Sequence, residues 1–190
     1  RFVGGRSWGR VILTGMGASY HATYPLMCRL LGAGIAAIRI ELSELNQCGV
    51  GLCDSTTLLV VVSQSGESAE IHRLLSLQPG SPLIAVTNSP ASTLARASGA
   101  RLFTEAGTEY SVSCKTYLSA LLALDWLSGA FLGQSAESLA SDAMRVIPPV
   151  SAYLEHWRGH VMELIERFRQ TRHIFLMGRG PSLDRKSTRL

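Results

Sequence analysis

Short apolar runs rich in β-branched residues recur along the first half of the chain, and each run ends at small or polar residues. The strongest run is Thr57–Val62, and a similar one covers Arg10–Thr14 directly before a pair of glycines. Such runs are typical of strands that are buried on both faces of a parallel sheet. The further strands that this pattern predicts are Ile35–Ile40, Leu83–Val86 and Ala100–Phe103.

Segments with a helical pattern of apolar residues lie between these predicted strands. Because strands alternate with helices, the sequence predicts an α/β fold with a doubly wound parallel sheet. Such sheets bind ligands at the carboxyl ends of their strands. The predicted helices are Tyr20–Leu31, a short one near Ser43–Gln47, one that ends near Leu77, Ser92–Ala97 and Val112–Leu132.

The second half of the chain predicts a different organisation. Pro148-Pro149 is expected to break the helical region, because proline removes a backbone donor and clashes with the preceding turn. A helix over Ser151–Gln170 and a strand over His173–Met177 are expected to follow. Val11–Ser19 and Ile174–Ser182 both read as a strand followed by Gly-x-Gly-x-Ser, which indicates an internal repeat.

This pattern divides the chain into four predicted segments. We expect a first α/β domain over residues 1–133, a helical linker over 134–172 and the truncated start of a second copy over 173–183. The tail 184–190 resembles translated adapter sequence and is treated as non-native. The chain opens without methionine, and its first residues do not have the pattern expected of a signal peptide.

The composition and the distribution of charge argue against nucleic-acid and membrane partners. Hydrophobic residues make up 46% of the chain and charged residues 17%, so a packed core is expected. The net charge is +4, but Arg185, Lys186 and Arg189 crowd the last six residues and no basic stripe exists elsewhere, so we expect no nucleic-acid partner. The longest apolar stretch, Tyr117–Leu132, is interrupted by Asp125 and is too short to span a bilayer, so we expect no membrane partner.

The cysteines indicate a reducing compartment. None of the four belongs to a CxxC pair, and no cluster of histidine and cysteine has zinc-ligand spacing. Free thiols of this kind are typical of cytoplasmic proteins, so we expect a cytoplasmic protein without a metal. The four are Cys28, Cys48, Cys53 and Cys114.

The segment Ser63–Ser68 joins the strongest strand to a helix and carries three hydroxyl groups and one side-chain amide. Free N–H groups and the helix dipole favour an anion at such a junction, and Gly66 would let the backbone approach a ligand closely. These features predict a phosphate monoester site. A turn with a serine N-cap and a following Glu67, without any ligand, is the alternative.

The loop Gly15–Ser19 follows the first strand, so it belongs at the same edge of the sheet. Tyr20 departs from the Gly-x-Gly-x-x-Gly pattern of dinucleotide sites, and the only lysines, Lys115 and Lys186, do not form a Walker motif. The two loops together therefore predict a hydroxyl-lined pocket for a small phosphorylated metabolite, with no obligatory cation.

Three blocks in this order resemble the SIS (sugar isomerase) domain family, and within it the isomerase half of the glutamine–fructose-6-phosphate aminotransferases. The blocks are Gly15–His21, Val62–Ser68 and Ala106–Glu109 with Val112, and the resemblance covers Arg10–Leu132. It implies a flavodoxin-like sheet of five strands and a phosphosugar site. By motif, the residues that would contact the sugar phosphate are Ser19, Ser63, Gln64, Ser65, Ser68, Val112 and Ser113.

The resemblance also implies an activity. It indicates a ketose/aldose phosphate isomerase or an aminosugar-phosphate isomerase/deaminase that needs no metal or organic cofactor and forms a homodimer. The proton-transferring groups would come from a second domain and from a partner subunit, with Glu109 a weak candidate base in this chain. Glu67 is expected to be an acid in the first turn of its helix.

Two other functions remain open at this point. SIS domains also act as phosphosugar-sensing effector domains of transcription regulators, and a purely structural dimerisation domain would leave the serine loop unoccupied. We expect no amide-hydrolysing half, because no segment with an N-terminal cysteine precedes Arg10.

Overall fold

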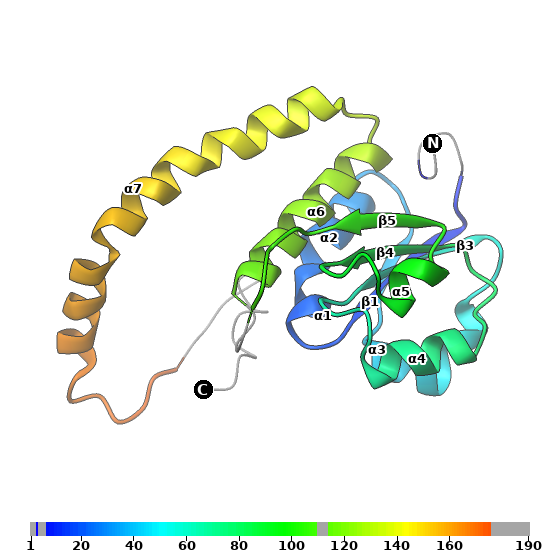
Figure 1. Ribbon diagram of the computed structural model, residues 1–190, viewed down its shortest axis with the longest axis horizontal. Coiled ribbons are helices and arrows are strands. Elements are labelled where there is room, and N and C mark those ends of the chain that lie inside the picture. The colour runs from blue at the N-terminus through cyan, green and yellow to red at the C-terminus, as the bar shows by residue number, and fades with distance from the viewer. Residues whose placement is uncertain (1–2, 4–6, 110–113, 176–190) are drawn as a thin grey trace. The chain divides into compact units, whose positions relative to one another are not determined.

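A five-stranded parallel sheet forms the centre of the fold (Figure 1). The computed structural model describes residues 3, 7–109 and 114–175. The strand order is β2-β1-β3-β4-β5, and every neighbouring pair is parallel. The strands are β1 (Arg10–Gly15), β2 (Ala37–Arg39), β3 (Thr57–Val62), β4 (Leu83–Thr87) and β5 (Ala100–Phe103).

The order of the strands reverses between β1 and β3. The chain runs from β1 outward to β2 and then returns to build β3, β4 and β5 on the other side. This point is where open α/β sheets bind ligands. The register pairs Gly15 with Val62, so the loops that follow β1 and β3 leave the sheet side by side.

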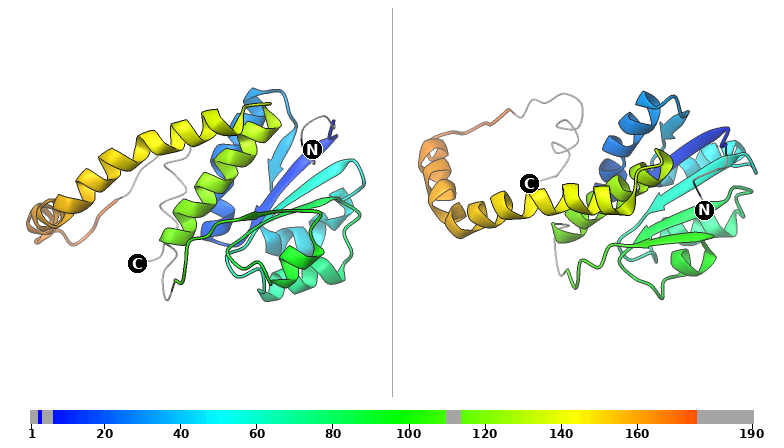
Figure 2. Two further views of the ribbon diagram at one scale, coloured as in Figure 1. Left: turned by 45° about the horizontal axis from the view of Figure 1, so that its top comes forward. Right: turned by 90° about the horizontal axis from the view of Figure 1, so that it is seen from above.

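Helices cover both faces of this sheet (Figure 2). The alternation of side chains along β1 shows the division, because Val11 and Leu13 join one core cluster and Ile12 joins the other. The described helices are α1 (Ala18–Ala22), α2 (Tyr24–Gly32), α3 (Leu42–Glu44), α4 (Ala69–Ser76), α5 (Thr93–Ala97), α6 (Lys115–Phe131) and α7 (Ala136–Phe168), with a π-helical turn η1 (Leu45–Gly49) and a 3₁₀ turn η2 (Val50–Leu52).

The predicted doubly wound fold is confirmed, but one of its helices is divided. The segment expected to form a single helix over Tyr20–Leu31 forms α1 and α2, which meet at Thr23. Pro25 lies in the first turn of α2, where its missing N–H is tolerated, and it would break the hydrogen bonds of a continuous helix. The Thr23 hydroxyl donates to the Tyr20 carbonyl at 2.6 Å and satisfies the end of α1.

The helix expected near Ser43–Gln47 is longer and less regular than predicted. It begins as α3, widens into η1 and tightens into η2, which ends at Leu52. Leu42 and Leu45 are buried against the sheet while the turn changes its pitch, so packing of the apolar side chains outweighs regular helix geometry here.

The expected break at Pro148-Pro149 is wrong. Both prolines lie inside α7, which runs without interruption from Ala136 to Phe168 and bends along its length (Figure 1). Helical hydrogen bonds on both sides keep the segment helical, while the two missing donors and the ring clashes are relieved by bending.

The chain divides into two compact units, Arg1–Gln134 and Ser135–Leu190. The first contains the sheet and α1–α6, and the second contains α7. His173–Phe175 form no strand, and the rest of the predicted second copy lies outside the described residues.

Candidate functional site

The β3–α4 loop, residues 63–68, leaves a strand that is wholly buried and enters α4 at its N-cap, Ser68. The loop is partly closed on itself. The Gly66 N–H donates to Ser63 Oγ at 3.1 Å, and the Glu67 N–H donates to Ser65 Oγ at 3.2 Å. A hydroxyl that accepts a hydrogen bond keeps its own proton, so both serines retain a donor for a ligand.

Other donors of this loop are open. The N–H groups of Gln64, Ser65 and Ser68 find no acceptor in the described part of the chain. The Ser68 hydroxyl does not cap α4. Free N–H groups at the start of a helix favour a bound anion. The loop therefore has the donors that a phosphate group needs.

The β1–α1 loop approaches the end of β3 very closely. A Cβ atom at Gly15 would lie 2.8 Å from the Val62 carbonyl oxygen and 3.0 Å from the carbonyl carbon of Ser19. Only glycine fits between these backbone atoms, so Gly15 allows α1 to begin against the end of β3. A narrow cavity of about 10 Å³ results, and both Ser19 and Gln64 line it. The structure thus brings these two predicted residues together.

An open groove of about 490 Å³ continues from Gln64 toward β5. Its far wall is held by Asn88, which follows β4. Asn88 Nδ2 donates to the Gly107 carbonyl at 2.8 Å, and Asn88 Oδ1 accepts from the Ala106 N–H at 2.8 Å. Sequence reasoning missed this residue, although its place directly after a predicted strand puts it at the ligand-binding edge of the sheet.

Glu109 also lines the groove, but its carboxylate accepts hydrogen bonds from the start of α6. It accepts from the N–H groups of Cys114 and Lys115, both at 2.8 Å, and from the N–H and hydroxyl of Thr116. The Thr116 hydroxyl is the main reason that the pKa of Glu109 falls to about 2, and the three N–H groups add to the effect. A general base works best with a pKa near the working pH. This geometry gives Glu109 a helix-capping role and disfavours it as a base.

Glu67 is placed differently from its predicted position in the first turn of a helix. It lies before α4, and its carboxylate accepts from the Thr93 N–H at 2.6 Å, at the start of α5. Hydrogen bonds from the Thr93 N–H and hydroxyl hold the pKa of Glu67 below its usual range, and His72 and Arg96 add smaller effects of the same sign.

Val112 and Ser113 lie outside the described residues. Within residues 3, 7–109 and 114–175, no group of three His, Cys, Asp or Glu side chains is arranged to hold a metal ion. In that same part of the chain, no helix combines the length and the apolar character that a membrane span requires.

Together, these features define a flavodoxin-like α/β protein with a loop rich in hydrogen-bond donors at the switch point of its sheet. The SIS domain matches residues 6–128, and the chain belongs to the SIS domain family. The resemblance seen in the three sequence blocks is thereby confirmed.

Relatives of known sequence match most of the chain. It is 32% identical to the glutamine–fructose-6-phosphate aminotransferase (isomerizing) of Thermococcus kodakarensis, over 93% of this chain and 31% of that protein. The aminotransferase of the same name from Streptococcus pneumoniae R6 is 30% identical, over 90% of this chain and 30% of its own length. The chain therefore spans about a third of the length of these curated relatives.

Solved structures show the same fold. The C-terminal domain of glucosamine-fructose-6-phosphate aminotransferase from Francisella tularensis superposes with a TM-score of 0.76 at 21% identity, covering 94% of this chain and 53% of that one. Glucosamine-6-phosphate deaminase from Thermotoga maritima gives a TM-score of 0.59 at 21% identity, over 70% of this chain and 42% of that one.

Proposed function

We propose that this chain binds a sugar phosphate as part of a ketose/aldose phosphate isomerase or an aminosugar-phosphate isomerase/deaminase. The observation that carries the proposal is the β3–α4 loop, which combines serine hydroxyls with open N–H groups at the switch point of the sheet and whose Gln64 shares a cavity with Ser19. These donors are uncharged, so they suit a phosphate monoester that is bound without a metal ion.

The site residues divide between phosphate and sugar. We assign the phosphate and the nearest sugar hydroxyl to a set of five residues, and the sugar to Val112 and Ser113. The adjoining groove lies within the range of about 300–1,000 Å³ that is typical of small-molecule sites. The five are Ser19, Ser63, Gln64, Ser65 and Ser68.

Isomerisation moves a proton between adjacent carbon atoms and therefore needs a base near its working pKa. The Glu109 carboxylate already accepts hydrogen bonds from the N–H groups at the start of α6. We therefore assign the proton-transferring groups to a second domain or to the partner subunit of a homodimer. The curated relatives, which carry the names of enzymes, offer no support for the alternative of a regulator's effector domain.

The double variant Ser63→Ala/Ser65→Ala tests the phosphate assignment. Hydrogen bonds to a charged group contribute about 1.5–3 kcal/mol each, so we expect the affinity for fructose 6-phosphate to fall by at least ~10-fold. Calorimetric titration of the 190-residue chain measures this change, and circular dichroism checks that the variant is folded. Unphosphorylated fructose is the control ligand, and an unchanged affinity of the folded variant for fructose 6-phosphate would defeat the assignment.

A further inference from the structure

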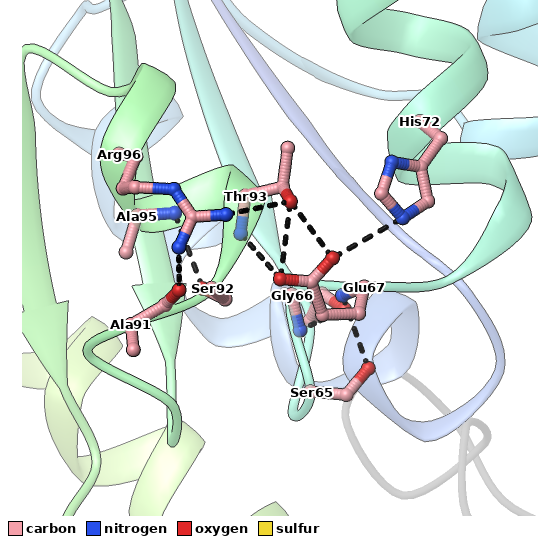
Figure 3. A network of polar contacts seen from close by, with 10 residues as sticks. Ser65, Gly66, Glu67, His72, Ala91, Ser92, Thr93, Ala95 and Arg96 are labelled. Carbon is pink, nitrogen blue, oxygen red and sulfur yellow. Dashed lines mark hydrogen bonds and ion pairs between the residues drawn. The ribbon is translucent and has the colours of Figure 1, made fainter.

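Glu67 joins the β3–α4 loop to the first turn of α5 (Figure 3). Its Oε1 accepts from the Thr93 N–H at 2.6 Å, and its Oε2 accepts from the Thr93 hydroxyl at 2.8 Å. The preceding residue is bonded to the same helix, because the Gly66 carbonyl accepts from the Leu94 N–H at 3.2 Å. Two consecutive loop residues are therefore fixed to α5.

The start of the same loop is fixed in the same direction. The Gln64 carbonyl accepts from the Asn88 N–H at 3.0 Å and from the Thr87 hydroxyl at 3.2 Å. The carbonyl groups of Gln64 and Gly66 thus both point toward the β4–α5 segment, residues 87–94, which runs from the end of β4 to the first turn of α5.

This direction determines where the N–H groups point. In a planar trans peptide the C=O and N–H groups point in opposite directions. The peptides that follow Gln64 and Gly66 therefore direct the N–H groups of Ser65 and Glu67 away from the β4–α5 segment. The Ser65 N–H has no acceptor in the described structure, and the Glu67 N–H meets the Ser65 hydroxyl. Because the carbonyl groups of Gln64 and Gly66 are held by hydrogen bonds, the N–H groups of Ser65 and Glu67 are held facing the opposite side of the loop.

A carboxylate beside a phosphate site would normally repel the ligand. Here the charge of Glu67 is partly offset, because the carboxylate lies at the positive end of α5; its Oε2 is 3.1 Å from His72 Nε2. Arg96 also lies beside it and donates to Thr93 Oγ1 at 3.2 Å. The positive end of α5 and Arg96 therefore weaken the repulsion between Glu67 and an anion at the loop.

We propose that Glu67 is a positioning residue, which holds the β3–α4 loop against α5 so that the Ser65 N–H and the serine hydroxyls face the phosphate group. This inference rests on the proposed function, since it needs a phosphate at the loop. The ligand is not expected to touch the Glu67 side chain.

Glu67→Ala and Glu67→Gln test this role in the 190-residue chain. We expect Glu67→Ala to weaken binding of both inorganic phosphate and fructose 6-phosphate by ~10-fold, on the order of one lost charge-assisted hydrogen bond. Glu67→Gln should restore most of the affinity, because its amide oxygen still accepts from Thr93. Calorimetry and an NMR titration that follows the Ser65 N–H signal measure both effects.

Asp54→Ala is the matched control. Asp54, like Glu67, has a carboxylate that accepts from backbone N–H groups, here those of Thr56 at 2.8 Å and Thr57 at 2.9 Å, but it lies before β3, far along the strand from the phosphate loop. Its loss should lower the thermal midpoint and leave the ligand affinity and the Ser65 signal unchanged.

The outcomes separate the two proposals. If the native chain binds fructose 6-phosphate and Glu67→Ala binds it equally well, the positioning role is wrong and the proposed function stands. If the native chain binds neither phosphate nor fructose 6-phosphate, both proposals fail. Should Glu67→Ala not fold, Glu67→Asp decides, since its shorter side chain keeps the charge but withdraws from Thr93; native affinity in that variant would overturn the positioning role.

Discussion

Gly66 occupies a position in the β3–α4 loop where both the backbone conformation and the available space exclude a side chain. Its φ of +64° lies in the left-handed region, and a Cβ atom would lie 2.4 Å from Ser92 Oγ and 2.6 Å from Ser92 Cβ. Ser92 is buried at the N-cap of α5, where its Oγ accepts from the Ala95 N–H, so moving it away would break this cap. The sequence suggested that this glycine makes room for a ligand, whereas the structure shows it making room for a neighbouring serine.

Gly66→Ala is therefore expected to lower the free energy of unfolding by about 2–4 kcal/mol, from left-handed strain together with overpacking. Urea denaturation measures the change. Gly51→Ala is the control, because no atom lies within 4 Å of its added Cβ and its φ is not positive, so a change below about 1 kcal/mol is expected there. A Gly66→Ala protein as stable as the native chain would contradict this account of the loop.

At the scale of single elements, α6 shows how a helix start is completed from outside the helix. Its N-cap residue is Cys114, whose side chain makes no capping bond. Glu109 supplies the missing acceptor from five residues earlier in the chain. The usual signal of Ser, Thr, Asp or Asn at the N-cap is absent at Cys114, which explains why the expected start at Val112 missed the described one at Lys115.

Glu109→Gln is expected to remove a pH-dependent part of the stability. The pKa of Glu109 is lowered from 4.5 to about 2, so its stabilising effect is fully present above pH 4.5 and disappears as the pH falls toward 2. The native chain should exceed Glu109→Gln in urea midpoint at pH 7, and the two should converge near pH 2. The comparison isolates Glu109 from Asp54 and Glu67, whose pKa values are also lowered. A difference that stays constant between pH 7 and pH 2 would exclude the capping role.

At the scale of the whole molecule, the candidate site arises from the order of the strands. Ser19 and Gln64 are far apart in the sequence, and they share a cavity because β1 and β3 are neighbours at the switch point. The backbones of Val62 and Ser19 meet at Gly15, which admits no side chain. The site therefore belongs to the sheet as a whole and depends on both loops.

We expect this chain to bind its sugar phosphate without catalysing the isomerisation. We predict that it binds fructose 6-phosphate but converts it to an aldose phosphate at close to the uncatalysed rate, since Glu109 has too low a pKa to act as an efficient base. An assay that couples aldose-phosphate formation to a dehydrogenase measures the rate. Rapid turnover would mean that these 190 residues contain an effective base and would contradict this prediction.

The sequence alone determined the parallel α/β fold and the serine loop at the end of β3. Buried strands need apolar side chains on both faces, and a run such as Thr57–Val62 satisfies that need wherever it occurs, so its bounds were predicted correctly. Only the tertiary structure decided that Glu67 reaches α5, that Glu109 caps α6 and that Asn88 supports the groove. Each of these roles depends on a hydrogen bond to a residue in another part of the fold. Such hydrogen bonds leave no periodic pattern in the sequence.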